Sequence, residues 1–245
     1  MDGVSLIYED KDFIAVSKPA GLLVHKVRED NEPTLVDWVL GRYPEVAKVG
    51  DPPTSSGQVD LLRPGIVHRL DKDTSGIILI PRNQEYFEYL KKLFQEHKIR
   101  KNYLALVYGK LEPKTGIIDK PIALKSGTTK RTVWEGKMEK EAVTEYEVQK
   151  YFKSDSALSK SNKEPFFTLV KVMPKTGRTH QIRIHLASVG HPIVGDSLYG
   201  PKTNPFNLNR QFLHAESLEW TTLDGHRMKI ECELPDDLQK IISNI

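Results

Sequence analysis

The chain reads HRLDKDTSG from His68 to Gly76, and this stretch lies between two short apolar runs. The runs Gly65–Val67 and Ile77–Ile80 are rich in β-branched residues and short enough to be buried strands. The connection between them carries two carboxylates, an arginine and a lysine, and rigid flanking strands can hold such groups in one orientation. The pattern therefore predicts either a reactive carboxylate or a turn in which Asp71 bonds its own backbone near Thr74, as Asx turns do.

Four separated blocks of the sequence carry a resemblance to a known family. In chain order they are Ile7–His25, His68–Gly76, Lys101–Gly109 (KNYLALVYG) and Thr176–Leu186 (TGRTHQIRIHL), and GHPIVGD follows at Gly190–Asp196. Together they resemble the motifs of the RluA-type pseudouridine synthases, which isomerise uridine to pseudouridine in RNA. The resemblance covers most of the chain and implies an isomerase of RNA modification, in ribosomal RNA or transfer RNA processing.

The fold class follows from the order of the expected elements. Strands and helices alternate without the regular strand–helix–strand pattern of a parallel sheet, which favours an α+β class. The resemblance implies the pseudouridine-synthase catalytic fold, with a central mixed, mostly antiparallel β-sheet, flanking helices and an active-site cleft. We expect a single catalytic domain over residues 1–245, because the sequence shows no linker and no internal repeat. Since the first block begins within the first ten residues, we expect no N-terminal accessory RNA-binding domain.

Local patterns predict where the elements lie. Strands are expected at Leu6–Tyr8, Phe13–Ser17, Tyr103–Tyr108, Thr144–Tyr151, Phe166–Met173 and near Met228–Cys232. Helices are expected at Leu35–Tyr43 behind Thr34 as N-cap, after Asn83 with the apolar positions Phe87, Leu90 and Phe94, from Thr179 to Val189 with Gly190 at C′, and near Leu238–Ile242. Residues 46–64 read as a loop, and residues 115–134 as a basic excursion of strands and loops.

Bulk composition is that of an ordinary globular protein, with 245 residues of which 38% are hydrophobic and 28% are charged. No apolar run is long enough to cross a bilayer, and the N-terminal residues show no secretory signal. Cys232 is the only cysteine, which excludes an intrachain disulfide and a cysteine-based metal cluster. We therefore expect a cytoplasmic protein with no membrane partner.

Basic residues are concentrated in the middle of the chain. The net charge is only +3, but between Lys91 and Lys140 thirteen lysines and arginines stand against five acidic residues. A positive face is the electrostatic footprint of a protein that binds the phosphate backbone of nucleic acid, although a solvated lysine-rich surface has the same composition.

The reaction implied by the resemblance breaks the bond from the ribose to the base nitrogen and forms a bond from the ribose to carbon 5 of the base. It needs no metal, no redox step and no cofactor. An ionised carboxylate can serve as nucleophile or base, and the resemblance assigns this role to Asp71, with the target base flipped out of its stack. Asp73 is the rival carboxylate and is more simply a loop or helix-cap residue. The sequence leaves open whether the carboxylate attacks directly or removes a ribose proton to give a glycal.

The resemblance assigns catalytic roles to two further residues. Tyr103 matches the tyrosine that stacks on the target base, and its phenol offers both a π face and a polar edge. Arg183 matches the arginine expected to pair with the catalytic aspartate, where it would offset the rise in pKa that burial alone causes. The plainer alternatives are a core tyrosine in a strand and a solvent-facing arginine on a helix.

Six residues are candidates for contacts with the substrate, namely Arg69, His68, Arg178, Thr179, Leu186 and Ile193. The arginine of the HRLD sequence could replace the flipped nucleotide or hold a phosphate, and the histidine before it could equally bond neighbouring backbone. The pair at the expected helix start lies where exposed amides attract phosphate. The two apolar residues could form a wall against the base, although any fold would bury them.

No metal site is expected, because His180 and His185 are five residues apart and do not share a helix face as an i, i+4 pair would. The partner implied by the resemblance is RNA, and we expect a monomer. The lead-in Asp60–Val67 looks more like the branch of the family that modifies ribosomal RNA, which favours large-subunit ribosomal RNA over transfer RNA.

Two other hypotheses fit parts of the sequence. A glycosidase could use Asp71 and Asp73 as its carboxylate pair, but this explains neither Tyr103 nor the basic segment. A non-catalytic RNA-binding protein or RNA chaperone on the same scaffold is the stronger alternative, although a binder needs no buried carboxylate near an RNA backbone. The target uridine and the number of sites stay open.

Overall fold

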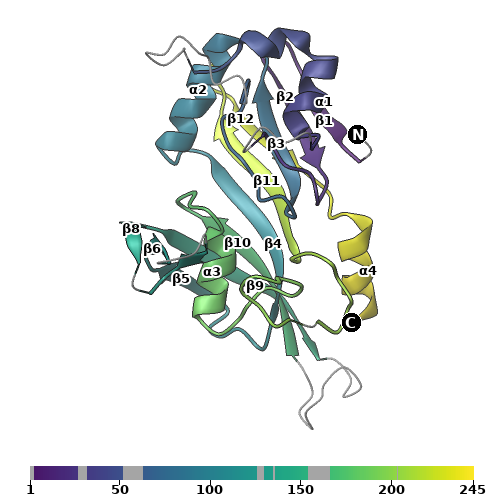
Figure 1. The fold of residues 1–245 in the computed structure, drawn as a ribbon, viewed down its shortest axis with the longest axis vertical. Helices are drawn as coiled ribbons and strands as arrows, with labels where there is room; N and C mark the ends of the chain where they lie inside the picture. Colours follow the sequence, from purple (N-terminus) through teal and green to yellow (C-terminus); the bar gives the residue numbers. More distant parts are fainter. Residues whose placement is uncertain are drawn as a thin grey trace. The chain divides into compact units, whose positions relative to one another are not determined.

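The computed structural model describes residues 3–26, 32–51, 63–125, 130–134, 136–153, 166–202 and 204–245 (Figure 1). The chain divides into two compact units. The first unit comprises Met1–Arg100 and Ser217–Glu233, and the second comprises Lys101–Glu216 and Leu234–Ile245. Among the described residues, no helix is both long enough and apolar enough to cross a membrane.

The first unit is built on antiparallel strands. They are β1 (Ser5–Glu9), β2 (Phe13–Lys18), β3 (Ser75–Pro81) and the end of β11 (Leu213–Thr221), in that order, and β12 (Arg227–Glu231) pairs with β11. Its helical segments are α1 (Leu35–Arg42), the 3-10 helix η1 (Pro44–Lys48) and α2 (Gln84–Gln95). The side chains of Ile77–Ile80 in β3 are completely buried, as expected for a short β-branched strand inside a sheet. The two N-terminal strands predicted at Leu6–Tyr8 and Phe13–Ser17 are confirmed, and they pair as a hairpin.

Both helix starts predicted in this unit are confirmed by their caps. The Thr34 side chain accepts a hydrogen bond from the backbone N–H of Asp37, whose carboxylate accepts the N–H of Thr34 in return. This reciprocal capping box satisfies two backbone donors at once. At α2, the Asn83 side chain accepts the N–H of Tyr86 at 2.9 Å. Local rules therefore determine where these two helices begin.

The predicted strand over Gly65–Val67 is wrong. Gly65 has a φ of +68°, a left-handed conformation that breaks an extended strand, and the N–H of Ile66 closes a turn onto the carbonyl of Arg63. A side chain at position 65 would also meet Val46, which belongs to η1. The prediction of a loop over residues 46–64 is likewise wrong at its start, because η1 extends to Lys48.

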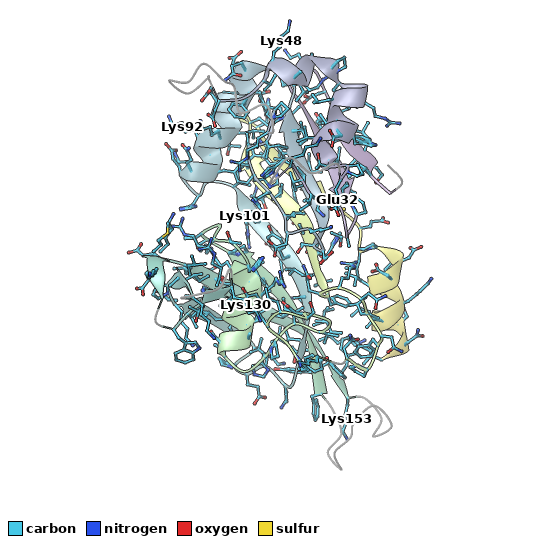
Figure 2. All side chains as sticks on the ribbon, in the orientation of Figure 1. Glu32, Lys48, Lys92, Lys101, Lys130 and Lys153 are labelled. Carbon is cyan, nitrogen blue, oxygen red and sulfur yellow. The ribbon has the colours of Figure 1, made fainter. Side chains whose placement is uncertain are left out.

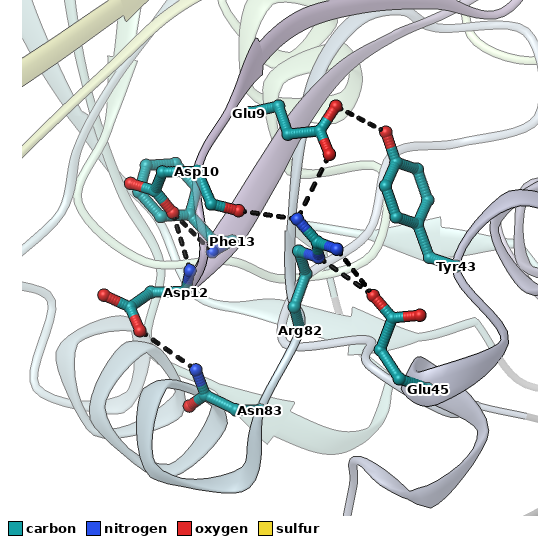
Figure 3. Close-up of polar contacts among 8 residues, drawn as sticks. All are labelled: Glu9, Asp10, Asp12, Phe13, Tyr43, Glu45, Arg82 and Asn83. Carbon is teal, nitrogen blue, oxygen red and sulfur yellow. Dashed lines mark hydrogen bonds and ion pairs between the residues drawn. The ribbon is translucent and has the colours of Figure 1, made fainter.

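Arg82, directly after β3, is the centre of a polar network in this unit (Figure 3). Its guanidinium donates to Glu9 at 3.1 Å, to the backbone carbonyl of Asp10 at 2.8 Å and to Glu45 at 2.8 Å. Tyr43 donates its hydroxyl proton to the same Glu9. These side chains are partly exposed, so the network contributes more to the geometry of the β1–β2 turn and η1 than to stability.

The second unit has two sheets. Its main sheet has the order β11, β4 (Arg100–Tyr108), β10 (Phe166–Pro174), β9 (Val143–Lys153) and β5 (Thr115–Asp119). A small sheet has the order β7 (Arg131–Thr132), β6 (Ile122–Leu124) and β8 (Lys137–Lys140). The helices α3 (Gln181–Ser188) and α4 (Asp236–Asn244) complete the unit. Among described residues, every pairing recorded between named strands is antiparallel, which confirms the α+β class.

The strands predicted in the second unit are confirmed at Tyr103–Tyr108, Thr144–Tyr151 and Phe166–Met173, each within a slightly longer element. Strand β11 was not predicted, although it is nine residues long and mostly buried. Its sequence LHAESLEWT mixes polar and apolar residues without a clean period of two, because both of its faces are largely covered.

The crowding at Gly65 gives a test of how the segment before Asp71 is held. A Cβ at this position would lie 2.6 Å from Cγ1 of Val46 and 3.2 Å from Cγ2 of Ile80. We expect Gly65→Ala to lower the free energy of unfolding by about 2–4 kcal/mol, from backbone strain and steric overlap together. Urea denaturation measures the loss. Gly21→Ala is the matched control, because Gly21 has a φ of +82° but open space around it, and we expect it to cost about 1 kcal/mol. Equal losses would contradict a steric contribution.

Candidate active site

The segment that carries Asp71 is irregular backbone held by a buried cation. The ammonium of Lys18 is completely buried and donates to the carbonyls of Pro19, Leu22 and Lys72 at 2.8, 2.8 and 2.9 Å. The N–H of Gly21 also donates to the Lys72 carbonyl, at 3.0 Å. The Lys72–Asp73 peptide, one residue beyond Asp71, is therefore held by two donors at its carbonyl. Lys18 lies within the Ile7–His25 block of the resemblance, but sequence reasoning did not predict that it holds this backbone.

The side chains of the HRLD sequence have different environments. Leu70 is buried and anchors the segment, Asp71 is partly buried and Arg69 is exposed. The ring of His68 stacks on Phe94 at 4.4 Å, and its Nε2 accepts the N–H of Leu79 at 2.9 Å. This contact fits the structural alternative for His68. The turn after Asp71 is closed by its backbone carbonyl, which accepts the N–H of Thr74 at 3.1 Å.

In the second unit, Tyr103 lies on β4 opposite Val172 of β10. It is partly buried and packs against the hydrophobic core that contains Leu106 and Val170. Side chains alternate between the faces of a strand, so Lys101 and Tyr103 share one face of β4.

Arg183 on α3 forms a buried ion pair with Asp196. Its Nε donates to one carboxylate oxygen at 2.6 Å and its Nη2 to the other at 2.9 Å. The Asp196 side chain is fully buried and also accepts the N–H groups of Leu198 and Tyr199. Burial alone would raise the pKa of Asp196, but the hydrogen bonds and charge of Arg183, with these two N–H groups, hold the pKa below its usual value. Sequence reasoning missed Asp196, because nothing local marks which distant arginine it meets.

Tyr199 connects this ion pair to other elements. The Arg183 guanidinium carbon lies 5.3 Å from the centre of the Tyr199 ring. The Tyr199 hydroxyl accepts the N–H of Arg131 at 3.2 Å and lies 3.0 Å from Nδ1 of His180. Through this one side chain, α3 and the small sheet share a polar connection.

The predicted start of the third helix is wrong. The helix begins at Gln181, two residues after Thr179, and its N-cap residue His180 has the left-handed φ of 56°. The Gln181 side chain explains the difference, because its Oε1 accepts the Arg178 N–H at 3.0 Å and the Thr176 hydroxyl at 2.7 Å. The amide of Arg178 is therefore bonded within the protein.

The other end of this helix is confirmed. Gly190 has a φ of 88° and donates its N–H to Ala187, while the N–H of His191 donates to Leu186. This pair of bonds is the Schellman arrangement, which favours glycine at C′.

The remaining substrate-contact candidates lie in the second unit. Arg178 is partly buried and its Nε donates to the carbonyl of Glu141 at 2.9 Å, whereas Thr179 is exposed. Leu186 and Ile193 are completely buried members of the hydrophobic core, and Ile193 bridges Val107 of β4. The structure thus places Tyr103, Arg183, Leu186 and Ile193 in one unit and His68, Arg69 and Asp71 in the other. Their roles toward a substrate stay predictions.

Lys101 is a site candidate that sequence reasoning did not single out. Its Nζ is partly buried and lies 3.5 Å from the carbonyl of Thr176, just before α3 (labelled in Figure 2). Burial, with a smaller contribution from the charge of Lys175, lowers the pKa of its amine to about 8. Strongly shifted pKa values cluster at functional sites, which makes this partly buried amine a candidate. The available signal was a lysine two residues before the motif tyrosine.

Comparisons with known proteins agree on one family. The family model described as RNA pseudouridylate synthase matches residues 12–188. An RNA pseudouridine synthase of Aquifex aeolicus is 41% identical over 201 residues, which are 82% of this chain and 57% of that protein. The ribosomal large subunit pseudouridine synthase D of Nitrosomonas europaea is 36% identical over 253 aligned residues, covering 99% of this chain and 65% of that protein. This chain therefore spans less than two thirds of the length of either relative.

The solved structure of human RNA pseudouridylate synthase domain containing 1 is similar in fold. It matches with a TM-score of 0.72 and 25% sequence identity, over 96% of this chain and 84% of that one.

The buried ion pair predicts an acid-sensitive contribution to stability. We expect Asp196→Asn to lower the free energy of unfolding by about 3 kcal/mol at pH 7, because it leaves the buried Arg183 without its counter-charge. Because the folded-state pKa of Asp196 lies below its unfolded value of 3.8, this contribution is complete above pH 4 and is lost as the pH falls through the folded-state pKa. Urea denaturation across this range measures it.

The matched control for that pair is Asp237→Asn. Asp237 makes the same two-bond pair with Arg210, at 2.7 and 2.9 Å, but its side chain is 47% exposed. We expect this change to cost about 0.5 kcal/mol at pH 7. Similar losses from both variants would contradict the importance of burial.

The low pKa of Lys101 predicts that replacing this lysine with an uncharged residue stabilises the protein. Its folded-state pKa of about 8 lies below the unfolded value of 10.5, so the charged amine destabilises the protein fully below pH 8, and this penalty disappears as the pH rises to 10.5. We expect Lys101→Met to raise the free energy of unfolding by about 2 kcal/mol at pH 7, with the gain shrinking toward pH 10. The exposed Lys110 provides the control, since Lys110→Met should change stability by less than about 0.5 kcal/mol at either pH. A Lys101→Met gain that does not depend on pH would refute this explanation.

Proposed function

Since the chain belongs to the RNA pseudouridylate synthase family, we propose that it isomerises uridine to pseudouridine in RNA with Asp71 as the catalytic carboxylate. One observation carries the proposal: the family match over residues 12–188 includes all three motif residues Asp71, Tyr103 and Arg183. The similarity of fold to a solved pseudouridylate synthase domain supports it.

The environment of Asp71 suits a reactive carboxylate. The backbone that follows it is held by the Lys18 ammonium and the Gly21 amide at the Lys72 carbonyl, and Leu70 before it is buried. A partly buried carboxylate on a fixed backbone can meet a reacting atom without a large loss of conformational entropy.

The proposed reaction needs only acid–base and nucleophilic chemistry. The bond from the ribose to the base nitrogen breaks with its electron pair staying on the nitrogen, and the uracil turns. A bond then forms from the ribose to carbon 5, the proton on carbon 5 leaves to a base, and the nitrogen takes up a proton. In one route the Asp71 carboxylate forms a transient ester with the sugar; in the other it takes a ribose proton to give a glycal. Both routes require Asp71 to be ionised when the step begins.

Arg183 and Tyr103 complete the proposed catalytic set, as the family resemblance implies. We assign Arg183 to the stabilisation of the ionised carboxylate, and its own orientation is determined by the two bonds to Asp196. We assign Tyr103 to stacking on the flipped base, because its ring is partly buried on a strand whose neighbours form the core.

We further propose large-subunit ribosomal RNA as the substrate. Relatives from Nitrosomonas europaea and Yersinia pestis carry the name ribosomal large subunit pseudouridine synthase D, and they are 36% and 32% identical to this chain. The sequence before the HRLD motif favours the same branch.

Pseudouridine mapping of purified reactions tests the function directly. We expect the wild-type protein to modify large-subunit ribosomal RNA transcripts from its own source, and Asp71→Asn to lower the rate by at least about 10³-fold, because a neutral amide is neither nucleophile nor base. Asp73→Asn is the matched control, since it removes a carboxylate two residues away, and we expect a change of less than about threefold.

Three outcomes would decide between the alternatives. An active Asp71→Asn protein would refute the assigned carboxylate. Modification of transfer RNA alone would refute the substrate and leave the reaction. RNA binding without any pseudouridine in either RNA would favour the non-catalytic RNA-binding alternative.

A further inference from the structure

The small sheet of the second unit exposes a tryptophan. Trp134, between β7 and β8, is 73% exposed, and Met138 on β8 is 71% exposed. Its neighbour Val133 packs instead against the buried cluster of Ile122, Ala142 and Ile184. Trp134 is therefore exposed beside a residue that is anchored in the core, and aromatic side chains are enriched at interaction surfaces.

The segment around this tryptophan carries the net charge of the protein. Residues 120–141 contain six lysines and arginines and three acidic residues, whereas the rest of the chain has thirty of each. All four residues of β8 are exposed, including Lys137 and Lys140. An exposed aromatic ring within a positively charged segment is complementary to a nucleic acid, which presents base faces and phosphates together.

Contacts in the structure hold this surface in position. The amine of Lys120 lies 5.9 Å from the centre of the Trp134 ring and donates to the carbonyl and the hydroxyl of Ser188 at 3.2 and 3.3 Å. The backbone N–H of Trp134 donates to the Thr132 hydroxyl at 3.0 Å. The N–H of Arg131 donates to Tyr199, whose ring also meets Arg183. The surface around Trp134 is therefore connected to α3, the helix that carries the proposed catalytic arginine.

We propose that Trp134 is a stacking platform for an unpaired base of the RNA substrate, and that Lys120, Lys137 and Lys140 contact the adjoining phosphates. The inference rests on the proposed function and extends it to a second contact with the substrate, away from the residues assigned to the reaction. Stacking needs an accessible base face, so the platform selects single-stranded RNA, whereas the lysines attract any RNA.

Intrinsic fluorescence gives a direct test, because the chain has only three tryptophans and Trp220 is buried. The probe is a single-stranded RNA of ten uridines. We expect it to quench the fluorescence of the wild-type protein and Trp134→Ala to bind it about tenfold more weakly. Trp134→Phe should keep affinity within about threefold, because a phenyl ring still stacks, while losing most of the quenching. Wild-type affinity in Trp134→Ala, or unchanged quenching in Trp134→Phe, would overturn the proposal.

Two controls separate stacking from charge. Ile117→Ala removes another apolar side chain of this unit that is 66% exposed, and it should leave binding unchanged. A ten-base-pair RNA duplex should bind wild type and Trp134→Ala equally, but should bind the double variant Lys137→Ala/Lys140→Ala more weakly. Trp134-dependent binding to anionic phosphatidylglycerol vesicles, without any effect on the uridine probe, would overturn the RNA assignment.

The same proteins, assayed for pseudouridine formation, distinguish this proposal from the proposed function. A wild-type protein that forms no pseudouridine but binds the probe through Trp134 would refute the function and leave the platform. An active enzyme whose rate and RNA affinity are unaffected by Trp134→Ala would refute the platform and leave the function.

Discussion

The fully buried ammonium of Lys18 must be satisfied by hydrogen bonds, and the acceptors that satisfy it position the segment around Asp71. An unsatisfied buried cation would be very costly, so its three carbonyl partners have to stay where they are. One of these partners is the backbone carbonyl of Lys72, the residue next to the proposed catalytic Asp71. A completely buried cation thus fixes the backbone beside the proposed catalytic carboxylate. These hydrogen bonds hold the irregular segment around Asp71 in place next to β3.

The second unit follows the same rule with a different pair of groups. Arg183 and Asp196 are both buried, and each satisfies the other through two hydrogen bonds. Tyr199 contributes a backbone N–H to the carboxylate, a ring to the guanidinium and a hydroxyl to the backbone of Arg131. Because each of these three groups contacts the other two, their contributions to stability are interdependent. The orientation of the proposed catalytic arginine is therefore a property of the network and not of the helix alone.

Sequence reasoning succeeded where the cause is local. Thr34 and Asn83 begin helices through bonds to residues three positions away, and Gly190 ends one because only a left-handed conformation closes the Schellman bonds. It failed at Gly65, where a turn replaces the predicted strand, and at Gln181, whose side chain moves the start of α3 past Thr179, because these local conformations compete with the pattern that the sequence suggests. It also failed where a distant contact decides the outcome. Lys18 bonds the carbonyl of Lys72, 54 residues away, and Arg183 bonds Asp196, 13 residues away. No short sequence pattern could identify these partners. The motif positions themselves came from the family resemblance, which names residues without giving their contacts.

The basic segment proposed to bind RNA and the segment of the proposed catalytic carboxylate are different parts of the chain. The segment 68–74 carries two acidic residues alongside Arg69 and Lys72, so the charge around Asp71 is close to balanced, whereas residues 120–141 hold the excess of basic residues. A carboxylate that must approach a phosphodiester backbone is repelled by it, and a separate basic segment can supply the attraction that offsets this repulsion. Phosphate contacts of this kind position an RNA but carry no sequence information. If affinity depends on that segment, the choice among uridines has to be made when the base leaves its stack. That step is least costly at unpaired or weakly stacked nucleotides. A protein whose affinity and selectivity are separated in this way would bind many RNAs and react with few of them. Its selectivity would depend on how easily the RNA unstacks the target base as much as on contacts to that base.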